Sequence, residues 1–492
     1  MIKAWLCAAL LVIAPLVTYG PTVFHEYGYR DDYAHLREVH ETPQNLLRFT
    51  SSYGRPVYGA LLVASVQPLG GVVANLQWLR LTSVLLLGLV GIALWRTLER
   101  NGWSTAESAV AGLLVTFLPA AQVTVGWSIA WPIVLSILLA LAGFRTVQTA
   151  VTQKGRRRLV AYGGAGLAYA IAALIYQPSA FFVVVPLAAV LLLRADPAGA
   201  RARWTAAHLA TAFGGVALGF GAMQIVFALD LLQPSGVMAI ERDPFGKLLW
   251  FIANPLANSV ALFAIRDRFA TPLIFWLAPL AVAALIAAGL ATRRNRAPID
   301  RYTMLFCVLV LPFVALAVNL GAEVRVPSYR TTYGLAGLVV VLVLYALRAL
   351  RDAGRLPRAA HYGALAALAL TAGVLAHGHA YRLIAQPQGW EWAIVRDAVR
   401  SLALGAGTRI YMIRPTIDDR ATLRIFADEY GSLSSNSDWA AVEMFRSALR
   451  LRFPNGLPPG LTYTLSSGLD VPRPGTFDAV IDMRKLKNHR RN

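Results

Sequence analysis

The sequence predicts an all-helical, polytopic membrane bundle of about 11 transmembrane helices, followed by a small α/β domain outside the cytoplasm. Of its 492 residues 57% are hydrophobic and only 15% are charged, with a mean hydropathy of +0.53, which is typical of integral membrane proteins. Apolar runs recur through residues 1–378, whereas residues 379–492 have the composition of a soluble protein. We therefore expect a membrane domain followed by a soluble α/β domain.

Each apolar run is close to the 20 or so residues that a membrane helix needs. The first begins with Lys3 and has no convincing cleavage site, so we interpret it as a retained signal-anchor helix. Several others are rich in alanine and glycine, which allows helices to pack closely in lipid. The predicted spans are 4–20, 78–97, 105–122, 128–146, 159–176, 180–194, 205–228, 272–292, 302–320, 332–350 and 360–377.

The arginines predict the orientation of these spans. Every second connection is basic, from Arg96 and Arg100 through "KGRRR" (154–158) to "RRNR" (293–296), whereas short connections such as "QVTVG" carry no Lys or Arg. Basic loops stay in the cytoplasm, so we expect a cytoplasmic N-terminus and an extracytoplasmic C-terminal domain. The net charge of +20 comes largely from these loops, and we do not expect nucleic acid as a partner.

Two further apolar stretches are interrupted by proline and by glycine or asparagine, at 55–74 and 248–265. If the first crossed the membrane, the later basic loops would face the wrong side, so we interpret both stretches as helices lying on the outer surface. The outward face then holds the first outer loop (21–77), a long loop (229–271), a short loop (321–334) and the C-terminal tail.

The tail alternates patterns typical of helices and strands. We expect amphipathic helices at "GWEWAIVRDAVRSLAL" and "SDWAAVEMFRSALRLRF". Strands are expected at "RIYMIRP", "LTYTLSS" and "FDAVIDM", which together predict a small α/β domain.

Two adjacent carboxylates, Asp31 and Asp32, follow the first span in the first outer loop. Like charges repel, so one of them is expected to hold its proton more tightly. A carboxylate at the membrane boundary can act as general base toward an attacking hydroxyl. Alternatively the pair caps the helix that begins there, since aspartate is favoured at helix N-termini. The two roles are compatible, because a cap also fixes the carboxylate in place.

The short outer loop places Arg325 and Arg330 on either side of Tyr329, against the trend for basic residues to stay inside. Guanidinium groups bind phosphate bidentately, so these arginines predict a lipid-linked phosphate site, with ordinary anionic headgroups as the alternative. Lys247 of the long loop is a weaker cleft candidate. Trp127 is either an interfacial anchor or a ring for stacking on a sugar.

No cofactor is predicted, and a divalent metal is not supported. His25, His35 and His40 share the first outer loop with the acidic pair, but their spacing matches no standard metal-binding pattern. Cys7 and Cys307 both lie inside apolar runs, which excludes a disulfide framework and a CxxC metal site.

The order of these elements resembles the GT-C class of membrane glycosyltransferases. Within that class, "YGYRDDYAHLRE" followed by "YGRPVYGALL" is similar to the bacterial GtrII-type glucosyltransferases that modify O-antigen. In that group an Asp-Asp pair in the first loop precedes Gly-Arg-Pro, here Gly54, Arg55 and Pro56. The segment "RTTYGLAGLVVVL" is similar to the arginine-containing start of a late span in the same group. The architectural resemblance covers residues 1–350, and the tail shows no family signature.

The resemblance implies a sugar donor on polyprenyl phosphate, a glycan or glycolipid acceptor of the cell envelope, and a bacterial inner-membrane location. It assigns the general base to Asp31 or Asp32 in an inverting transfer. Arg325, Arg330 and Arg55 would hold the departing phosphate, because a phosphate leaving group needs cations more than it needs a general acid. The candidate substrate contacts are Tyr329, Tyr33, Trp127 and Lys247.

Three other functions compete with this one. A lipid-linked oligosaccharide flippase or other transporter would place charges inside its spans, and the predicted spans are almost free of them. An O-antigen polymerase or ligase would rely on arginines in large outer loops rather than on a first-loop Asp-Asp. A non-catalytic envelope assembly protein would use the tail to bind a partner.

Overall fold

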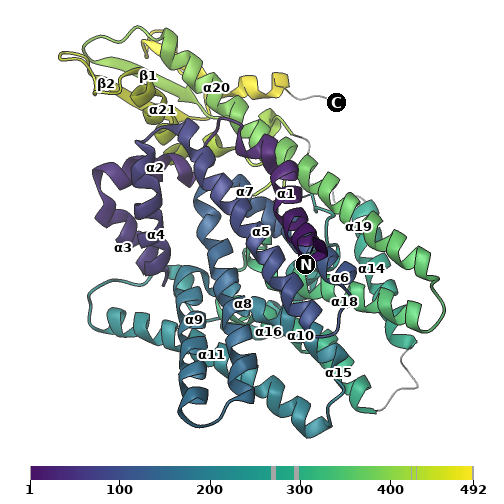
Figure 1. Cartoon of the computed structure of the whole chain (residues 1–492). Coiled ribbons are helices and arrows are strands. Elements are labelled where there is room, and N and C mark those ends of the chain that lie inside the picture. Colours follow the sequence, from purple (N-terminus) through teal and green to yellow (C-terminus); the bar gives the residue numbers. More distant parts are fainter. Residues whose placement is uncertain (1, 268–272, 293–297, 423, 428, 490–492) are drawn as a thin grey trace.

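The computed structural model describes residues 2–267, 273–292, 298–422, 424–427 and 429–489. It is a helical bundle that carries a small parallel sheet at one end (Figure 1). By length and composition, eight helices of the described residues are candidates to cross a membrane, or nine if one bent pair counts as a span. The predicted class, a helical membrane bundle with a C-terminal α/β unit, is confirmed at this level.

Each predicted span coincides with helix in the described residues. The bent pair, α6 and α7, changes direction by 50° at Leu118, directly before Pro119. Nearly every side chain of α10 and α18 is buried, so these two helices form the centre of the bundle. The helices concerned are α1 (Ile2–Val23), α5 (Gln77–Arg100), α6 (Thr105–Phe117), α7 (Pro119–Gly126), α8 (Trp131–Thr152), α9 (Gly155–Ala180), α10 (Val184–Leu193), α11 (Ala198–Ala228), α14 (Leu273–Ala291), α15 (Pro298–Leu309), α16 (Leu311–Ala315), α17 (Ala317–Gly321), α18 (Tyr333–Asp352) and α19 (Arg358–His379).

Helices α9 and α10 form one 39-residue apolar segment that doubles back on itself. A straight helix of that length would be about 58 Å long, roughly twice the hydrocarbon thickness of a bilayer. The helix is broken at Tyr176, whose φ and ψ of −156° and 103° are not helical. Gln148, in the last two turns of α8 just before the segment begins, contacts Asn101 at 3.3 Å, and Ala189 of α10 accepts from the Trp103 indole at 3.0 Å. Both ends of the segment are therefore near the loop after α5.

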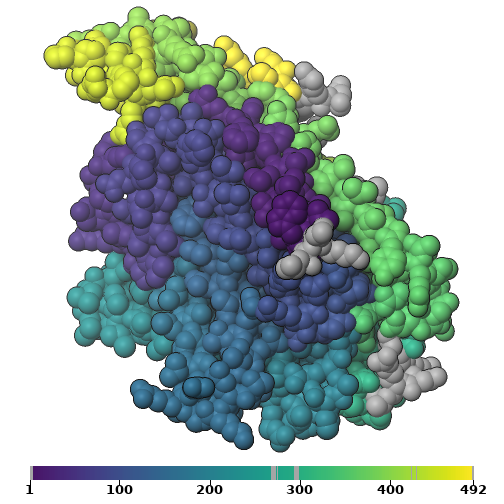
Figure 2. Space-filling view, in the orientation of Figure 1, coloured from purple at the N-terminus to yellow at the C-terminus, as the bar shows by residue number. Residues whose placement is uncertain are grey.

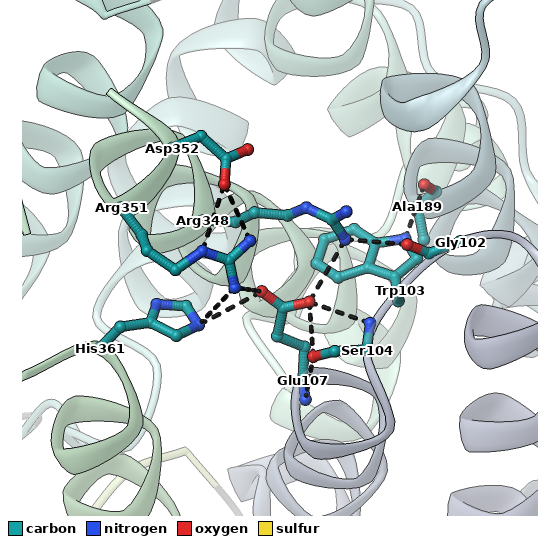
Figure 3. Close-up of polar contacts among 9 residues, drawn as sticks. All are labelled: Gly102, Trp103, Ser104, Glu107, Ala189, Arg348, Arg351, Asp352 and His361. Atoms are coloured by element: carbon teal, nitrogen blue, oxygen red, sulfur yellow. Dashed lines mark hydrogen bonds and ion pairs between the residues drawn. The ribbon is translucent and has the colours of Figure 1, made fainter. Parts of the chain in front are cut away.

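A polar cluster centred on Glu107 ties three helices together at one end of the bundle (Figure 3). The buried Glu107 carboxylate accepts from the backbone N–H and the hydroxyl of Ser104, at the start of α6. It also pairs with Arg348 at 3.3 Å and Arg351 at 3.0 Å, both in the last turns of α18. His361 of α19 lies 3.2 Å from the same carboxylate. These ion pairs therefore hold the ends of α6, α18 and α19 together.

The other basic connections lie at this same end. Arg348 donates to the Gly102 carbonyl at 3.0 Å, which joins the α18 end to the loop after α5. Arg201, at the start of α11, pairs with Asp300 of α15 at 2.7 Å. The predicted "RRNR" cluster at 293–296 and the side chain of Lys3 lie outside the described residues.

The opposite end carries the first outer loop and the tail, at the top of Figure 1. Three parallel strands pair in the order β2-β1-β3, and the predicted tail helices and strands are all present. The apolar stretches interpreted as surface helices form shorter, broken helices that are not among the eight candidate spans. The elements are α2 (Asp31–Glu41), α3 (Pro43–Ser52), α4 (Pro56–Val66), α12 (Pro244–Phe251), α13 (Ala257–Val260), α20 (Gln386–Ser401), α21 (Asp438–Arg452), β1 (Thr408–Ile413), β2 (Tyr463–Gly468) and β3 (Ala479–Asp482).

The tail and the first outer loop pack together into one unit, which we call the cap (residues 21–77 and 386–489). Helix α19 runs through a π-helical turn, Ala380–Ala385, directly into α20, so residue 379 lies inside a continuous helical segment rather than a linker. Tyr33 and Leu36 of the first outer loop share one hydrophobic core with Trp392 and Met444 of the tail. Figure 2 shows the tail lying over this loop at the top of the molecule.

Candidate functional site

Asp32 anchors the first outer loop to the bundle. Its side chain is fully buried, and its two oxygens accept separate backbone hydrogen bonds from Tyr29 at 2.9 Å and Ile129 at 3.1 Å. Burial raises the pKa of Asp32 to about 6, and these hydrogen bonds together with the Arg80 charge oppose the rise. The carboxylate therefore fixes the start of α2 against the turn before α8.

Arg80 fixes the same loop from the side of the bundle. Sequence analysis did not identify this role. Arg80 is fully buried at the start of α5 and lies 4.2 Å over the Tyr27 ring. Its guanidinium donates to the carbonyls of Val23, His25 and Tyr27, and to the Ser128 hydroxyl at 2.9 Å. The only sequence signal is an arginine inside an apolar helix. With Asp32, Arg80 fixes the path of the chain from α1 to α2.

Asp31 is the half-buried first residue of α2. Within the described part of the chain its carboxylate makes no hydrogen bond or ion pair, in contrast to that of Asp32. Desolvation raises the pKa of the half-buried Tyr58, and the charge of Asp31 adds a smaller rise. Arg30, directly before Asp31, has a φ of 46° and is held by Ser434, whose hydroxyl accepts from the Arg30 N–H at 2.9 Å. Such backbone strain often marks functional sites.

Arg55 and Arg330 approach one another beside Tyr176, at the break between α9 and α10. The Arg55 guanidinium lies 4.6 Å over the Tyr176 ring, and its Nε donates to Gln177 at 2.9 Å. The Arg330 guanidinium lies 4.4 Å over the Trp127 ring. Burial and the nearby Arg330 charge lower the pKa of Arg55. Both guanidinium groups are partly buried, so water screens their positive charges only in part.

Glu429 of the tail fixes the backbone at Arg330. Its fully buried carboxylate accepts from the Ser328 hydroxyl, the Tyr329 N–H at 2.7 Å and the Arg330 N–H at 3.3 Å. The same carboxylate is 3.9 Å from Arg330 Nε. Sequence analysis assigned no site residue to the tail, and no motif there points to Glu429.

Arg325 and Lys247 form a separate cluster that joins the long loop to the short loop. Arg325 Nη2 lies 3.2 Å from Glu241 and 3.1 Å from Asp243, and it holds the pKa of Glu241 down at about 2. Lys247 is buried 3.6 Å from Glu241 and donates to two carbonyls of the short loop. Both predicted cations are thus neutralised by carboxylates in this structure.

The predicted aromatic contacts differ in their surroundings. Tyr33 is fully buried in the cap, 5.9 Å from Trp392 between ring centroids. Tyr329 is also buried and packs on Phe426 of the tail at 4.5 Å. Trp127 lies beneath Arg330 and therefore belongs to the wall of the cationic site. Among the described residues no three His, Cys, Asp or Glu side chains are placed to hold a metal ion.

No protein-family model matches the chain, and no curated protein matches it.

Proposed function

We propose that the protein is a GT-C-type membrane glycosyltransferase, which transfers a sugar from a polyprenyl-phosphate donor to a glycan or glycolipid acceptor on the extracytoplasmic face. One observation carries this proposal: the guanidinium groups of Arg55 and Arg330 both lie beside Tyr176, and their charges and that of Asp31 act on the half-buried Tyr58, at the end of the bundle opposite the basic connections. A base and two cations in one place are what such a transfer needs.

In the proposed reaction Asp31 accepts the proton of an acceptor hydroxyl. The hydroxyl oxygen then attacks the anomeric carbon of the donor sugar while the bond from that carbon to the phosphate oxygen breaks. Polyprenyl phosphate leaves with the bonding electrons, and Arg55 and Arg330 balance its growing negative charge. Attack opposite the phosphate inverts the anomeric centre. Binding both substrates at one place supplies much of the acceleration.

We infer that Asp31 rather than Asp32 is the general base. Both oxygens of Asp32 already accept backbone N–H groups, whereas the Asp31 carboxylate is half-exposed and available to an acceptor. Asp32 is then a positioning residue that holds the first turn of α2. Glu429 has the same kind of role toward Arg330.

The proposal includes eleven membrane crossings, a cytoplasmic N-terminus and an extracytoplasmic cap, in a bacterial inner membrane. The doubled-back segment of α9 and α10, the bent pair α6–α7 and the short apolar α14 supply the crossings beyond the eight long helices. Single cysteines at Arg400, which is 62% exposed, and at the exposed Arg156 test the orientation. An impermeant thiol reagent added outside is expected to label position 400 and spare 156. The opposite pattern would reverse the topology.

The decisive experiment incubates the purified protein in lipid nanodiscs with a panel of polyprenyl-phosphate sugars and measures released polyprenyl phosphate. We expect release with at least one donor, and its loss in Asp31→Asn. Asp397→Asn, an exposed change on α20 at 63% exposure, is the matched control and is expected to keep full activity. Translocation of intact lipid-linked sugar without release would favour a flippase. Polymer growth or ligation of a whole lipid-linked glycan would favour a polymerase or ligase.

A further inference from the structure

A cavity of about 570 Å³ opens within the cap, between the first outer loop and the tail. One wall is the C-terminal half of α2, and the other is the end of α21 with the loop that follows and the first residue of β2. Charged and aromatic side chains line it together. The ones that matter here are Arg37, Glu41, Arg446, Arg450, Phe453 and Tyr463.

The cavity carries an excess of positive charge. Arg37 pairs with Glu443 at 2.7 Å and with Glu41 at 3.0 Å. Arg446 shares Glu443 at 2.8 Å, and Arg450 shares Glu41 at 2.8 Å. Glu38 also lies 4.0 Å from Arg37, so three carboxylates pair with these three guanidinium groups. The three arginines and Glu41 line the cavity, whereas Glu38 and Glu443 do not, so its wall carries more positive than negative charge.

The arginines of α21 keep donors for a ligand. Among the described residues, side-chain hydrogen bonds occupy one nitrogen of Arg446 and one of Arg450, although each guanidinium has five N–H groups. Their side chains are 47% and 32% exposed, so solvent reaches them. Gly71 of the first outer loop lies beside this wall, since a Cβ there would be 2.6 Å from Arg450 Nη1. The cavity is thus bounded on several sides yet open to a solute.

Helix α2 links this cavity to the proposed base. Asp31 is its first residue, and Arg37 and Glu41 follow six and ten residues later. At 1.5 Å per residue these positions are about 9 and 15 Å from Asp31 along the helix. A short oligosaccharide bound in the cavity is long enough to follow α2 back to Asp31.

We propose that this cavity binds an acidic saccharide, the glycan part of the acceptor. A uronate carboxylate suits the guanidinium forks of Arg446 and Arg450, which bind carboxylates bidentately. Glu41 can accept hydrogen bonds from sugar hydroxyls, and the apolar faces of Phe453 and Tyr463 can cover the C–H face of a sugar ring. The acceptor role rests on the proposed function, whereas binding itself does not require catalysis.

Fluorescence anisotropy of the full chain in nanodiscs tests the binding, with labelled tri-galacturonic acid as the acidic probe and labelled maltotriose as the neutral one. We expect the acidic probe to bind and to bind more weakly as salt rises, since exposed charges are screened. The double variant Arg446→Ala, Arg450→Ala should weaken its binding at least tenfold. Arg473→Ala, an exposed arginine of the tail outside the cavity, is the control and should change nothing.

Release of polyprenyl phosphate to water, with no acceptor present, separates this inference from the proposed function. The double variant should keep this release, because it leaves Asp31, Arg55 and Arg330 intact. No binding of tri-galacturonic acid, equal binding of maltotriose, displacement by inorganic phosphate at the same concentration, or an unchanged affinity in the double variant would each overturn the inference. Binding without release from any donor would keep the saccharide site and remove the transferase.

Discussion

Replacing Glu429 by glutamine tests whether the tail completes the cationic site. The buried carboxylate serves donors on both oxygens: Oε2 accepts the Tyr329 N–H, and Oε1 accepts the Arg330 N–H and the Ser328 hydroxyl. Glutamine keeps a single oxygen, so its NH₂ must face one of these donors. The variant also loses the negative charge 3.9 Å from Arg330 Nε.

Losing one charge-assisted hydrogen bond in a buried place costs about 1.5–3 kcal/mol. If this loss displaces Arg330 from its position, the rate of sugar release from the donor should drop by about 10- to 150-fold, since 1.4 kcal/mol is a factor of ten. Because Arg330 is proposed to hold the donor phosphate, KM for the donor should rise while the affinity for the saccharide probe stays unchanged. If Glu429 had only a structural role, its loss would change both the donor KM and the affinity for the saccharide probe.

The assay compares Glu429→Gln with Glu323→Gln, an exposed glutamate of the same short loop. Initial rates of polyprenyl phosphate release are measured over a range of donor concentrations, beside the melting temperature of each variant. Normal rates and a normal donor KM in a folded Glu429→Gln protein would refute the reasoning that the tail positions Arg330. The same reasoning would be refuted if Glu429→Gln lowered the melting temperature while the protein that remains folded kept normal kinetics.

Three further predictions concern other parts of the molecule. Glu107→Gln leaves Arg348, Arg351 and His361 without their shared carboxylate, so we expect the free energy of unfolding in chemical denaturant to fall by roughly 3 kcal/mol. Glu99→Gln, which breaks the partly exposed pair with Arg96, should lower it by less than about 1 kcal/mol. Folding raises the pKa of Asp32 to about 6, so the folded state binds its proton more tightly than the unfolded state. The free energy of unfolding should therefore fall by roughly 2 kcal/mol as pH rises from 4 to 7, and Asp32→Asn should flatten that slope. Arg330→Ala should raise the donor KM at least tenfold. Arg325→Ala removes the partner of Glu241 and Asp243 and should change the donor KM less. Equal effects of the two variants would mean that Arg325 also binds the donor.

The parts of the fold that the lipid bilayer constrains were predictable from the sequence. A bilayer requires helices of about 20 apolar residues, so the spans could be located from composition alone. The break at Tyr176 agrees with the predicted boundary between the spans 159–176 and 180–194. The bend between α6 and α7 was not predicted, because it lies inside the single predicted span 105–122, although Pro119 follows it directly. The amphipathic pattern of the tail helices predicts that one face of each is buried, but it does not identify the residues that cover that face.

The site was predictable residue by residue but not as an assembly. Asp31, Arg55 and Arg330 were candidates because each residue type suits a proton or phosphate transfer. Arg325 and Arg330 look alike in sequence, five residues apart on one loop. Only their partners distinguish them: Arg325 pairs with Glu241 and Asp243 of the long loop, whereas Arg330 lies over Trp127 and 3.9 Å from Glu429 of the tail. Those partners are distant in the chain, and pairwise charge complementarity cannot be read from a single sequence.

The contacts of the tail argue that it is part of the proposed site rather than an appended module. Arg30, in a strained conformation directly before Asp31, is held by Ser432 and Ser434. A left-handed φ on a non-glycine residue costs about 1–3 kcal/mol and persists only when its surroundings enforce it. The enforcing hydroxyls come from the tail, as does Glu429 beneath Arg330. Removing the tail would therefore relax the backbone at the proposed base and release the proposed phosphate cation together, so activity should vanish even where the bundle itself still inserts and folds.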